Sequence, residues 1–133
     1  MRFKQLLLTA AFFGLMLTGC GADEAAQPIP YEQITAEAAK RLMDEHPETV
    51  ILDVREQDEF DAGHIPEARL LPVGSVSEET AASVIPKKDT LVLVYCRSGR
   101  RSKLAAEELV ALGYTNIREF GGIIDWPYET TTD

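Results

Sequence analysis

Two short, almost wholly apolar segments constrain the fold of this chain more than any other feature of its sequence. Residues 50–54 (VILDV) and 90–95 (TLVLVY) are rich in β-branched and apolar residues and show little alternation between apolar and polar positions. Strands of this kind are buried on both faces, as in a parallel sheet covered by helices. Less apolar segments at 68–73 and 116–120 predict two further short strands.

Helical patterns separate these strands. The segments that predict helices or helical turns are residues 35–46, 56–61, 77–84 and 102–112. Thr35 and Ser77 can act as N-caps of the first and third segments, and Gly113 follows the last one as a stop signal. The alternation of strands and helices predicts an α/β fold with a small parallel sheet and helices on both of its faces.

The N-terminal part of the chain has the features of an export signal and not of a folded domain. Arg2 and Lys4 precede an almost unbroken apolar run at residues 6–18, which is too short to cross a bilayer as a helix. The run ends in Leu-Thr-Gly-Cys20, which resembles the lipobox of bacterial lipoproteins, in which the cysteine carries the lipid. An ordinary signal peptide that is cut a few residues later is the alternative.

The lipobox resemblance implies a lipoprotein signal peptide at 1–19, followed by the lipid-anchor Cys20 and a flexible tether that reach to residue 30. It also implies an exported protein that is held at a membrane and faces a periplasm or the cell exterior. The remaining length suits one domain, expected at 31–128, with a C-terminal tail at 129–133. The net charge of −9 argues against nucleic acid as a partner and against electrostatic docking on anionic lipid.

Cys96 stands out because the chain contains just one other cysteine, Cys20. With Cys20 expected to carry lipid, no disulfide is available within the chain, so a free thiol in an oxidising compartment needs a purpose. Cys96 directly follows a predicted strand and precedes a loop at 97–101 and a predicted helix. In a parallel α/β sheet this is the carboxyl end of a strand, where functional sites gather.

The loop after Cys96 has the composition of an anion-binding loop that favours a thiolate. Gly99 lets the backbone curl so that several N–H groups point at one centre, and the helix N-terminus adds free amides and its dipole. The loop residues predicted to bind a persulfide or an oxyanion are Arg97, Ser98, Gly99, Arg100 and Arg101. We therefore predict that Cys96 is a nucleophile. A small buried cysteine beside solvated surface arginines is the alternative.

Four motifs in order along the chain resemble those of single-domain rhodanese (thiosulfate sulfurtransferase-like) proteins. Residues 52–56 (LDVRE) and 60–68 (FDAGHIPEA) resemble the two N-terminal signatures of that family. Residues 96–102 (CRSGRRS) resemble its active-site loop, and residues 121–126 (GGIIDW) its closing element. The match runs from about residue 34 to residue 126, so the resemblance implies one rhodanese-like domain.

The family resemblance implies a sulfur-transfer mechanism. Cys96 would take the outer sulfur of a small anionic donor, such as thiosulfate or a persulfide, and pass it to a thiol or cyanide acceptor, or to a protein acceptor. No cofactor and no metal is implied. Asp53 and Arg55 are expected to support the site by pairing with loop groups, whereas His64 and Trp126 are expected to have structural roles.

Two positions depart from the family pattern within one turn. Glu67 stands where the family often has glycine, and Arg69 stands where a small or apolar residue is common. These departures leave the conformation of that turn undetermined, but they do not change the predicted fold. Gly121 and Gly122 are expected to make a turn that closes the following loop on the site.

Other functions that use a reactive cysteine fit the sequence less well. Cys-dependent phosphatases have an arginine after five intervening residues, whereas here Ser102 occupies that position and Arg101 comes one place too early. A dithiol oxidoreductase is disfavoured because the chain has no Cys-x-x-Cys motif. The main alternative is a non-catalytic binding or sulfur-relay module for a protein partner, because a fold does not fix a function.

Overall fold

The structure is a computed structural model that describes residues 30–133. The predicted signal peptide at 1–19, the predicted lipid anchor Cys20 and the predicted tether up to residue 29 lie outside the described residues. Within residues 30–133, no helix is both long enough and apolar enough to cross a membrane.

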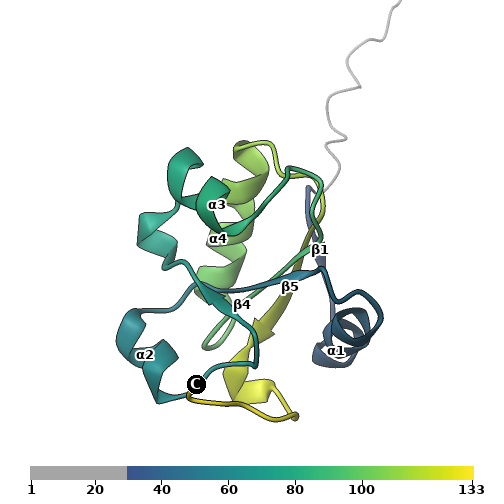
Figure 1. The fold of residues 1–133 in the computed structure, drawn as a ribbon, viewed down its shortest axis with the longest axis vertical. Coiled ribbons are helices and arrows are strands. Elements are labelled where there is room, and N and C mark those ends of the chain that lie inside the picture. The colour runs from purple at the N-terminus through teal and green to yellow at the C-terminus, as the bar shows by residue number, and fades with distance from the viewer. Residues whose placement is uncertain (1–29) are drawn as a thin grey trace, which may run out of the picture.

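A five-stranded parallel sheet forms the centre of the domain (Figure 1). Its strands are β1 (Glu32–Gln33), β2 (Val50–Asp53), β3 (Arg69–Leu70), β4 (Val92–Cys96) and β5 (Ile117–Gly122). They lie side by side in the order β1-β5-β4-β2-β3, and each neighbouring pair is parallel. The middle strand is therefore β4, the strand that leads into Cys96.

Helices cover both faces of the sheet, so the predicted α/β architecture is confirmed (Figure 1). The helical elements are α1 (Ala36–Glu45), α2 (Gln57–Ala62), α3 (Glu78–Val84) and α4 (Arg100–Ala111), with short 3-10 turns η2 (Val73–Ser75) and η3 (Ile123–Asp125). Helix α1 packs on one face, and α3 and α4 pack on the other. Both predicted N-caps are confirmed, because the Thr35 hydroxyl accepts from an amide of α1 and the Ser77 hydroxyl from one of α3.

The core consists of two apolar layers, one on each side of the sheet. Because side chains alternate along a strand, β4 sends Val92 and Val94 toward α3 and α4, and Leu93 and Tyr95 toward α1. A strand covered on both sides must be apolar at every position, which accounts for the continuous apolar run in the sequence. This arrangement fixes Cys96 at the end of the best-buried strand of the domain.

Besides shifts of one or two residues at other elements, three differences between the prediction and the structure concern β1, β3 and the start of α4. The first strand, β1, was not predicted, because two exposed polar residues give no periodic signal. The strand predicted at 68–73 is only two residues long, and Pro72, which has no N–H, follows it closely. Helix α4 begins at Arg100, two residues before the predicted start, because Gly99 and not a later residue is its N-cap.

The turn that contains Glu67 has the conformation that favours glycine. Glu67 has a φ angle of 72°, in the left-handed region, and the amide of Ala68 donates to the carbonyl of Ile65 at 3.0 Å. The turn therefore forms in spite of the departure from the family pattern, at a cost in backbone strain of about 1 kcal/mol. Arg69 is also accommodated, since its guanidinium donates to the carbonyl of Val84 at 2.6 Å.

Candidate functional site

Cys96 is the last residue of β4 and lies at the carboxyl end of the sheet. Its side chain is buried, with 1% of the residue exposed, and it is the only free cysteine among residues 30–133. The backbone amide of Gly99 donates to Cys96 Sγ at 2.9 Å, and the hydroxyl oxygen of Ser102 lies 3.5 Å from the same sulfur. The predicted curl of the loop around the sulfur is therefore present, with Gly99 at its centre.

These contacts make the Cys96 thiol more acidic than an ordinary cysteine. Burial by itself raises the pKa of the thiol, because it disfavours the charged form. A hydrogen bond with the Ser102 hydroxyl, together with hydrogen bonds from the amides of Ser102, Gly99 and Ser98, outweighs burial, so the pKa of Cys96 lies below its usual value. The site therefore favours a thiolate at lower pH than a free thiol would, as a sulfur nucleophile requires.

The loop after Cys96 is shorter than predicted. Arg97, Ser98 and Gly99 form it, whereas Arg100 and Arg101 belong to the first turn of α4. Gly99 has a φ angle of 109° and serves as the N-cap without a side-chain hydrogen bond. Since an L side chain rarely adopts this angle, glycine is what lets the chain turn from strand to helix while its amide points at the sulfur.

Gly122, at the end of β5, makes room for this loop. A Cβ atom built on Gly122 would lie 1.9 Å from the carbonyl oxygen of Arg97 and 2.5 Å from Cα of Ser98. The pair Gly121-Gly122 was predicted to form a turn. Only Gly121 has a positive φ angle (90°), whereas Gly122 is extended and allows the loop backbone to approach closely. The amide of Ile124 then donates to the Arg97 carbonyl at 3.2 Å, which ties η3 to the loop.

The three arginines of the motif have different surroundings. Arg97 and Arg100 are exposed, and no hydrogen bond from either side chain is found within the described part of the chain. Arg101 instead donates two hydrogen bonds to Glu59 of α2, at 2.8 and 3.0 Å. This pairing holds the pKa of Glu59 down at about 2. Arg101 therefore anchors α2 against the start of α4, and Arg97 and Arg100 are the arginines free to meet an anion.

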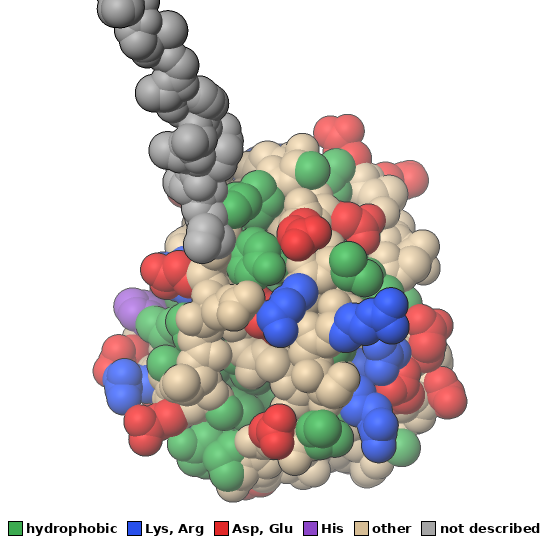
Figure 2. All heavy atoms as spheres, turned by 180° about the vertical axis from the view of Figure 1, so that it is seen from behind, with side chains coloured by type: hydrophobic (Ala, Val, Ile, Leu, Met, Phe, Trp, Pro, Cys, Tyr) green, Lys and Arg blue, Asp and Glu red, His purple; other side chains and the backbone are tan. Residues whose placement is uncertain are grey.

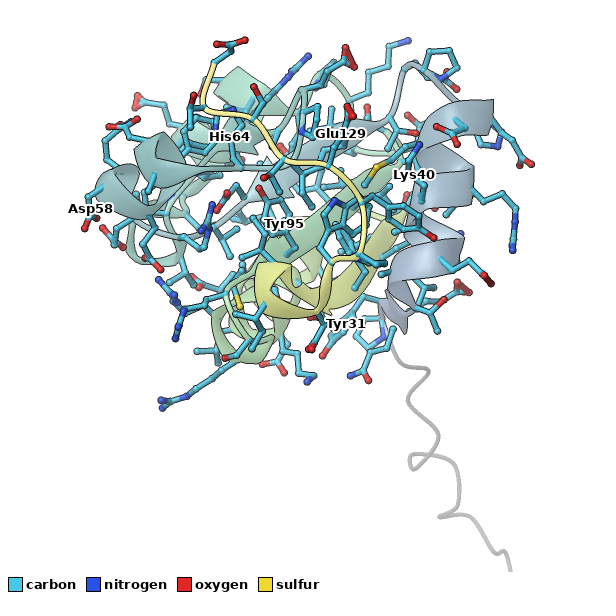
Figure 3. The ribbon with its side chains drawn as sticks, turned by 90° about the horizontal axis from the view of Figure 1, so that it is seen from below. Tyr31, Lys40, Asp58, His64, Tyr95 and Glu129 are labelled. Atoms are coloured by element: carbon cyan, nitrogen blue, oxygen red, sulfur yellow. The ribbon has the colours of Figure 1, made fainter. Side chains whose placement is uncertain are left out.

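Asp53 and Arg55 form a buried ion pair one strand away from Cys96. The Arg55 guanidinium donates to both carboxylate oxygens of Asp53, at 2.8 to 3.2 Å, and to the carbonyl of Gly63 at 2.8 Å. The hydroxyl of Tyr95, the residue before Cys96, donates to Asp53 at 2.5 Å and accepts from the amide of Ile65 at 3.1 Å. Figure 3 shows Tyr95 near the middle of the domain.

This network corrects the expected pairing of Asp53 and Arg55. Within the described residues, no hydrogen bond joins either side chain to residues 97–101. The ion pair instead fixes the end of β4 through Tyr95 and the turn at Gly63. Tyr95 was missed as a site-supporting residue, because in the sequence it reads as one more apolar strand position.

His64 and Trp126 are packing residues in the structure. His64 is buried, stacks on Phe60 with ring centroids 3.7 Å apart, and has Nδ1 2.9 Å from the carbonyl of Phe60. Its backbone pairs with Thr131, so the segment predicted as a C-terminal tail contacts the domain. Trp126 lies in the apolar layer on the α1 side, beside Phe120. Neither ring forms a hydrogen bond with Cys96.

Two polar residues behind Cys96 were not predicted. Ser102 and Glu119 are both buried, and the Ser102 hydroxyl donates to the Glu119 carboxylate at 2.5 Å. Glu119 lies on β5, at a sheet position next to Val94 of β4. The sequence holds only a weak signal for it, because Glu119 is one of two adjacent charged residues, with Arg118, in the predicted strand. That signal could be interpreted only once β5 was known to lie beside β4.

A shallow cleft of about 480 Å³ opens next to the Cys96 loop. Its walls include Arg55, Gly63, Arg97, Ile123 and Ile124. Ile124 is 58% exposed, more than the other exposed large apolar side chains of residues 30–133, Leu104 and Tyr128. The cleft thus offers a cation beside an apolar rim. Figure 2 shows most of the visible Lys and Arg side chains toward the right of that face, with others at its centre and left edge, whereas acidic side chains are spread over it.

A second pocket, of about 470 Å³, lies on the other side of the domain. It is lined by α1 and the C-terminal segment, including Met43, Ile51, Trp126 and Glu129. None of its lining residues belongs to the Cys96 loop. The cleft that Arg97 lines is therefore the one of the two that borders the Cys96 loop.

Comparison with known proteins gives a consistent result. A family model described as the rhodanese-like domain matches residues 35–127. The thiosulfate sulfurtransferase PspE of Escherichia coli is 39% identical over 74 residues, which cover 56% of this chain and 70% of that protein. A sulfurtransferase of Allochromatium vinosum is 35% identical over 95 residues, which cover 71% of this chain and 86% of that protein.

Solved structures agree with the sequence comparison. A rhodanese from E. coli, solved with anions, superposes with a TM-score of 0.59 at 32% identity and covers 64% of this chain and 99% of its own. Other curated relatives are longer. The chain spans 63%, 57% and 30% of the length of relatives from Schizosaccharomyces pombe, Bacillus subtilis and Mycobacterium tuberculosis. The B. subtilis relative has the provisional name of a sulfur carrier protein.

Proposed function

Because this chain belongs to the rhodanese family, we propose that it is a sulfurtransferase in which Cys96 carries the transferred sulfur as a persulfide. The observation that carries the proposal is the hydrogen bond from the Gly99 amide to Cys96 Sγ, at 2.9 Å, at the start of α4. It accompanies a thiol pKa below the usual value. A loop that stabilises negative charge on Sγ equally suits the charge of a bound persulfide.

The proposed reaction has two steps. The thiolate of Cys96 attacks the outer sulfur of a donor such as thiosulfate, and a new S–S bond forms while the S–S bond of thiosulfate breaks and sulfite leaves with the electron pair. An acceptor thiolate or cyanide then attacks the outer sulfur, and the Cys96 thiolate leaves. The sulfur is carried covalently between two separate encounters, so ping-pong kinetics follow.

The surroundings of the loop support an anionic donor. Arg97 and Arg100 are exposed beside the cleft, whereas the chain as a whole has a net charge of −9. A local positive potential on an acidic protein attracts anions to that one place. The E. coli rhodanese with a similar fold was solved with anions, which is consistent with such a donor.

A protein acceptor is a second candidate, favoured by the rim of the cleft. Ile124 is 58% exposed next to Arg97, and an apolar side chain beside a reactive group suits contact with another macromolecule. In that case the domain relays sulfur to a partner and turns over small acceptors slowly. The name of the B. subtilis relative as a sulfur carrier is in keeping with this role.

The test is the mass of the full-length chain after incubation with thiosulfate, with Cys20→Ser to leave Cys96 as the only cysteine. We expect one added sulfur atom, removed by cyanide or dithiothreitol and absent from a second sample that also carries Cys96→Ser. Loading from thiosulfate with slow release to cyanide would favour the relay role. No added sulfur from either thiosulfate or glutathione persulfide would refute both roles.

We also propose that the protein is an exported lipoprotein attached through Cys20. The support is the Leu-Thr-Gly-Cys20 sequence directly after the apolar run at 6–18. Cells grown with labelled palmitate should incorporate the label into the wild-type chain and not into Cys20→Ser. Equal labelling of the two chains, or no labelling of either, would contradict this attachment.

A further inference from the structure

Glu119 is a buried carboxyl group without a basic partner. The residue is 2% exposed, and no Lys, Arg or His within residues 30–133 forms an ion pair with it. Its Oε2 accepts hydrogen bonds from the Ser102 hydroxyl at 2.5 Å and from the Gly121 amide at 2.9 Å. Burying a carboxylate without a cation is costly, so a fold that keeps one there calls for an explanation.

Ser102 connects this carboxyl group to the reactive sulfur. Its hydroxyl oxygen lies 3.5 Å from Cys96 Sγ and 2.5 Å from Glu119 Oε2. A hydroxyl has one proton to donate, and an ionised carboxylate at this distance is its strongest acceptor. The Ser102 oxygen can then accept the S–H proton of Cys96. The three side chains therefore form a continuous hydrogen-bonded row from sulfur to carboxylate.

We propose that Glu119 is a positioning residue that accepts, through Ser102, the proton that the Cys96 thiol gives up. The S–H bond breaks as a proton moves to Ser102 Oγ, while the original Ser102 proton moves to Glu119 Oε2. The thiol and carboxylate become a thiolate and a carboxylic acid, and the net charge of the row does not change. The inference rests on the proposed function of Cys96 as a sulfur carrier.

The transfer moves one negative charge to the place where the loop can stabilise it. After the transfer, the Ser102 hydroxyl points at the sulfur and joins the Gly99 amide, which already donates to it at 2.9 Å. At Glu119 the negative charge has only two donors and no cation, and the added proton removes it. No proton has to cross to solvent, which suits a sulfur that is 1% exposed.

The other charged groups around Cys96, Ser102 and Glu119 take no part in the proposed proton transfer. From α4, the positive charge of Arg101 attracts the Cys96 thiolate but is paired with Glu59 of α2, and the ammonium group of Lys103 lies near Gly99. The strand neighbours of Glu119 are Gln33 on β1 and Val94 on β4, both uncharged. Arg97 and Arg100 of the loop are exposed to solvent.

The pH dependence of Cys96 alkylation by iodoacetamide tests the inference, in the full-length chain with Cys20→Ser. Two groups that share one proton through a hydroxyl titrate as a pair, so the rate should rise in two steps separated by a plateau. The lower step should be lost in Glu119→Gln, whose amide cannot take up the proton, so that one step remains. Glu108→Gln removes one negative charge from an exposed position of α4, the helix that contains Ser102, and should keep both steps.

A second measurement requires no substitution of Cys96, Ser102 or Glu119. In the same chain, the ¹³C shifts of the Glu119 carboxyl and the Cys96 Cβ should both change at the same two pH values. The inference would be overturned by a single alkylation step in the chain that carries only Cys20→Ser, or by two steps retained in Glu119→Gln. It would also be overturned if the two ¹³C shifts change at unrelated pH values. These readouts involve no sulfur donor, so they can fail or succeed separately from persulfide loading.

Discussion

Gly122 shows how the site depends on the absence of a side chain. The loop carbonyl of Arg97 occupies the volume that a Cβ atom of residue 122 would need, at 1.9 Å. The conflict is with backbone atoms, so no side-chain rotation can relieve it. The loop is therefore held against β5 at one distance, which also sets the place of the Gly99 amide relative to Cys96.

We expect Gly122→Ala to displace the loop and to lower the rate of persulfide loading by about 100-fold, because shifts of about 1 Å at a reacting group have effects of this size. The measurement is the rate of sulfur uptake from thiosulfate by mass spectrometry. Gly74→Ala is the matched control, since a Cβ at Gly74 would meet no atom within 4 Å and its φ angle is not positive. Loading in Gly122→Ala at the rate of the control would disprove the role of this contact.

Individual residues differ in how far the sequence reveals them. Cys96 and Gly99 could be identified because a cysteine, a glycine and the predicted helix start are adjacent in the chain. Ser102 ends the motif that resembles the active-site loop and replaces the arginine of a phosphatase, but neither observation predicts its contact with the sulfur. Its contact with Glu119 joins residues seventeen positions apart and depends on the register of β5 against β4, which no local pattern specifies.

The helices α2 and α4 are joined at the level of whole elements by the ion pair between Glu59 and Arg101. The motif suggested that Arg101 binds substrate, because position along the chain was the only available guide. The contact partner comes from α2, which is 42 residues away. Elements with a strong local signal could be predicted from the sequence, such as the continuous apolar strands β2 and β4 and the periodic helix α1. Contacts between elements could not, because they follow from topology.

The Glu59–Arg101 pair should make part of the stability acid-sensitive. The pKa of Glu59 is about 2 in the folded state and near its ordinary value of 4.5 in the unfolded chain, so the pair stabilises the fold above pH 4.5. That contribution is lost as the pH falls from about 4.5 to 2. Since both side chains are partly exposed, we expect a loss of about 1 kcal/mol.

Urea unfolding at pH 7 and at pH 3 measures this effect. The free energy of unfolding should fall less between the two pH values in Glu59→Gln than in the wild type. Glu107→Gln, an exposed substitution on α4, should behave as the wild type. An equal fall in Glu59→Gln and in the wild type would show that the pair contributes nothing to acid sensitivity.

For the whole molecule, the two apolar layers on either side of the sheet were predictable, because continuous apolar strands require cover on both faces. The contacts of residues 129–131 with the rest of the domain were not predictable. Thr131 exchanges two backbone hydrogen bonds with His64, both at 2.8 Å, and the Trp126 indole donates to the carbonyl of Glu129 at 3.2 Å. Figure 3 shows His64 and Glu129 lying toward the same side of the domain.

Ending the chain after Tyr128 should therefore destabilise the domain. Two backbone hydrogen bonds at about 1 kcal/mol each predict a loss of about 2 kcal/mol in the free energy of unfolding. Chemical denaturation of the full-length and shortened chains gives the value. A chain that lacks Asp133 alone keeps Thr131 and is the control. If both shortened chains unfold like the full-length chain, the pairing with His64 does not stabilise the fold.

The edges of the sheet have a consequence for behaviour at high concentration. The two outermost strands, β1 and β3, are only two residues long, and Glu32 and Arg69 place a charge on each. A long, uncharged edge offers a row of unpaired N–H and C=O groups on which another chain can add a strand. Edges this short offer almost no template, so we expect the lengths of its edge strands, as well as its net charge, to keep the folded domain from adding strands of other chains.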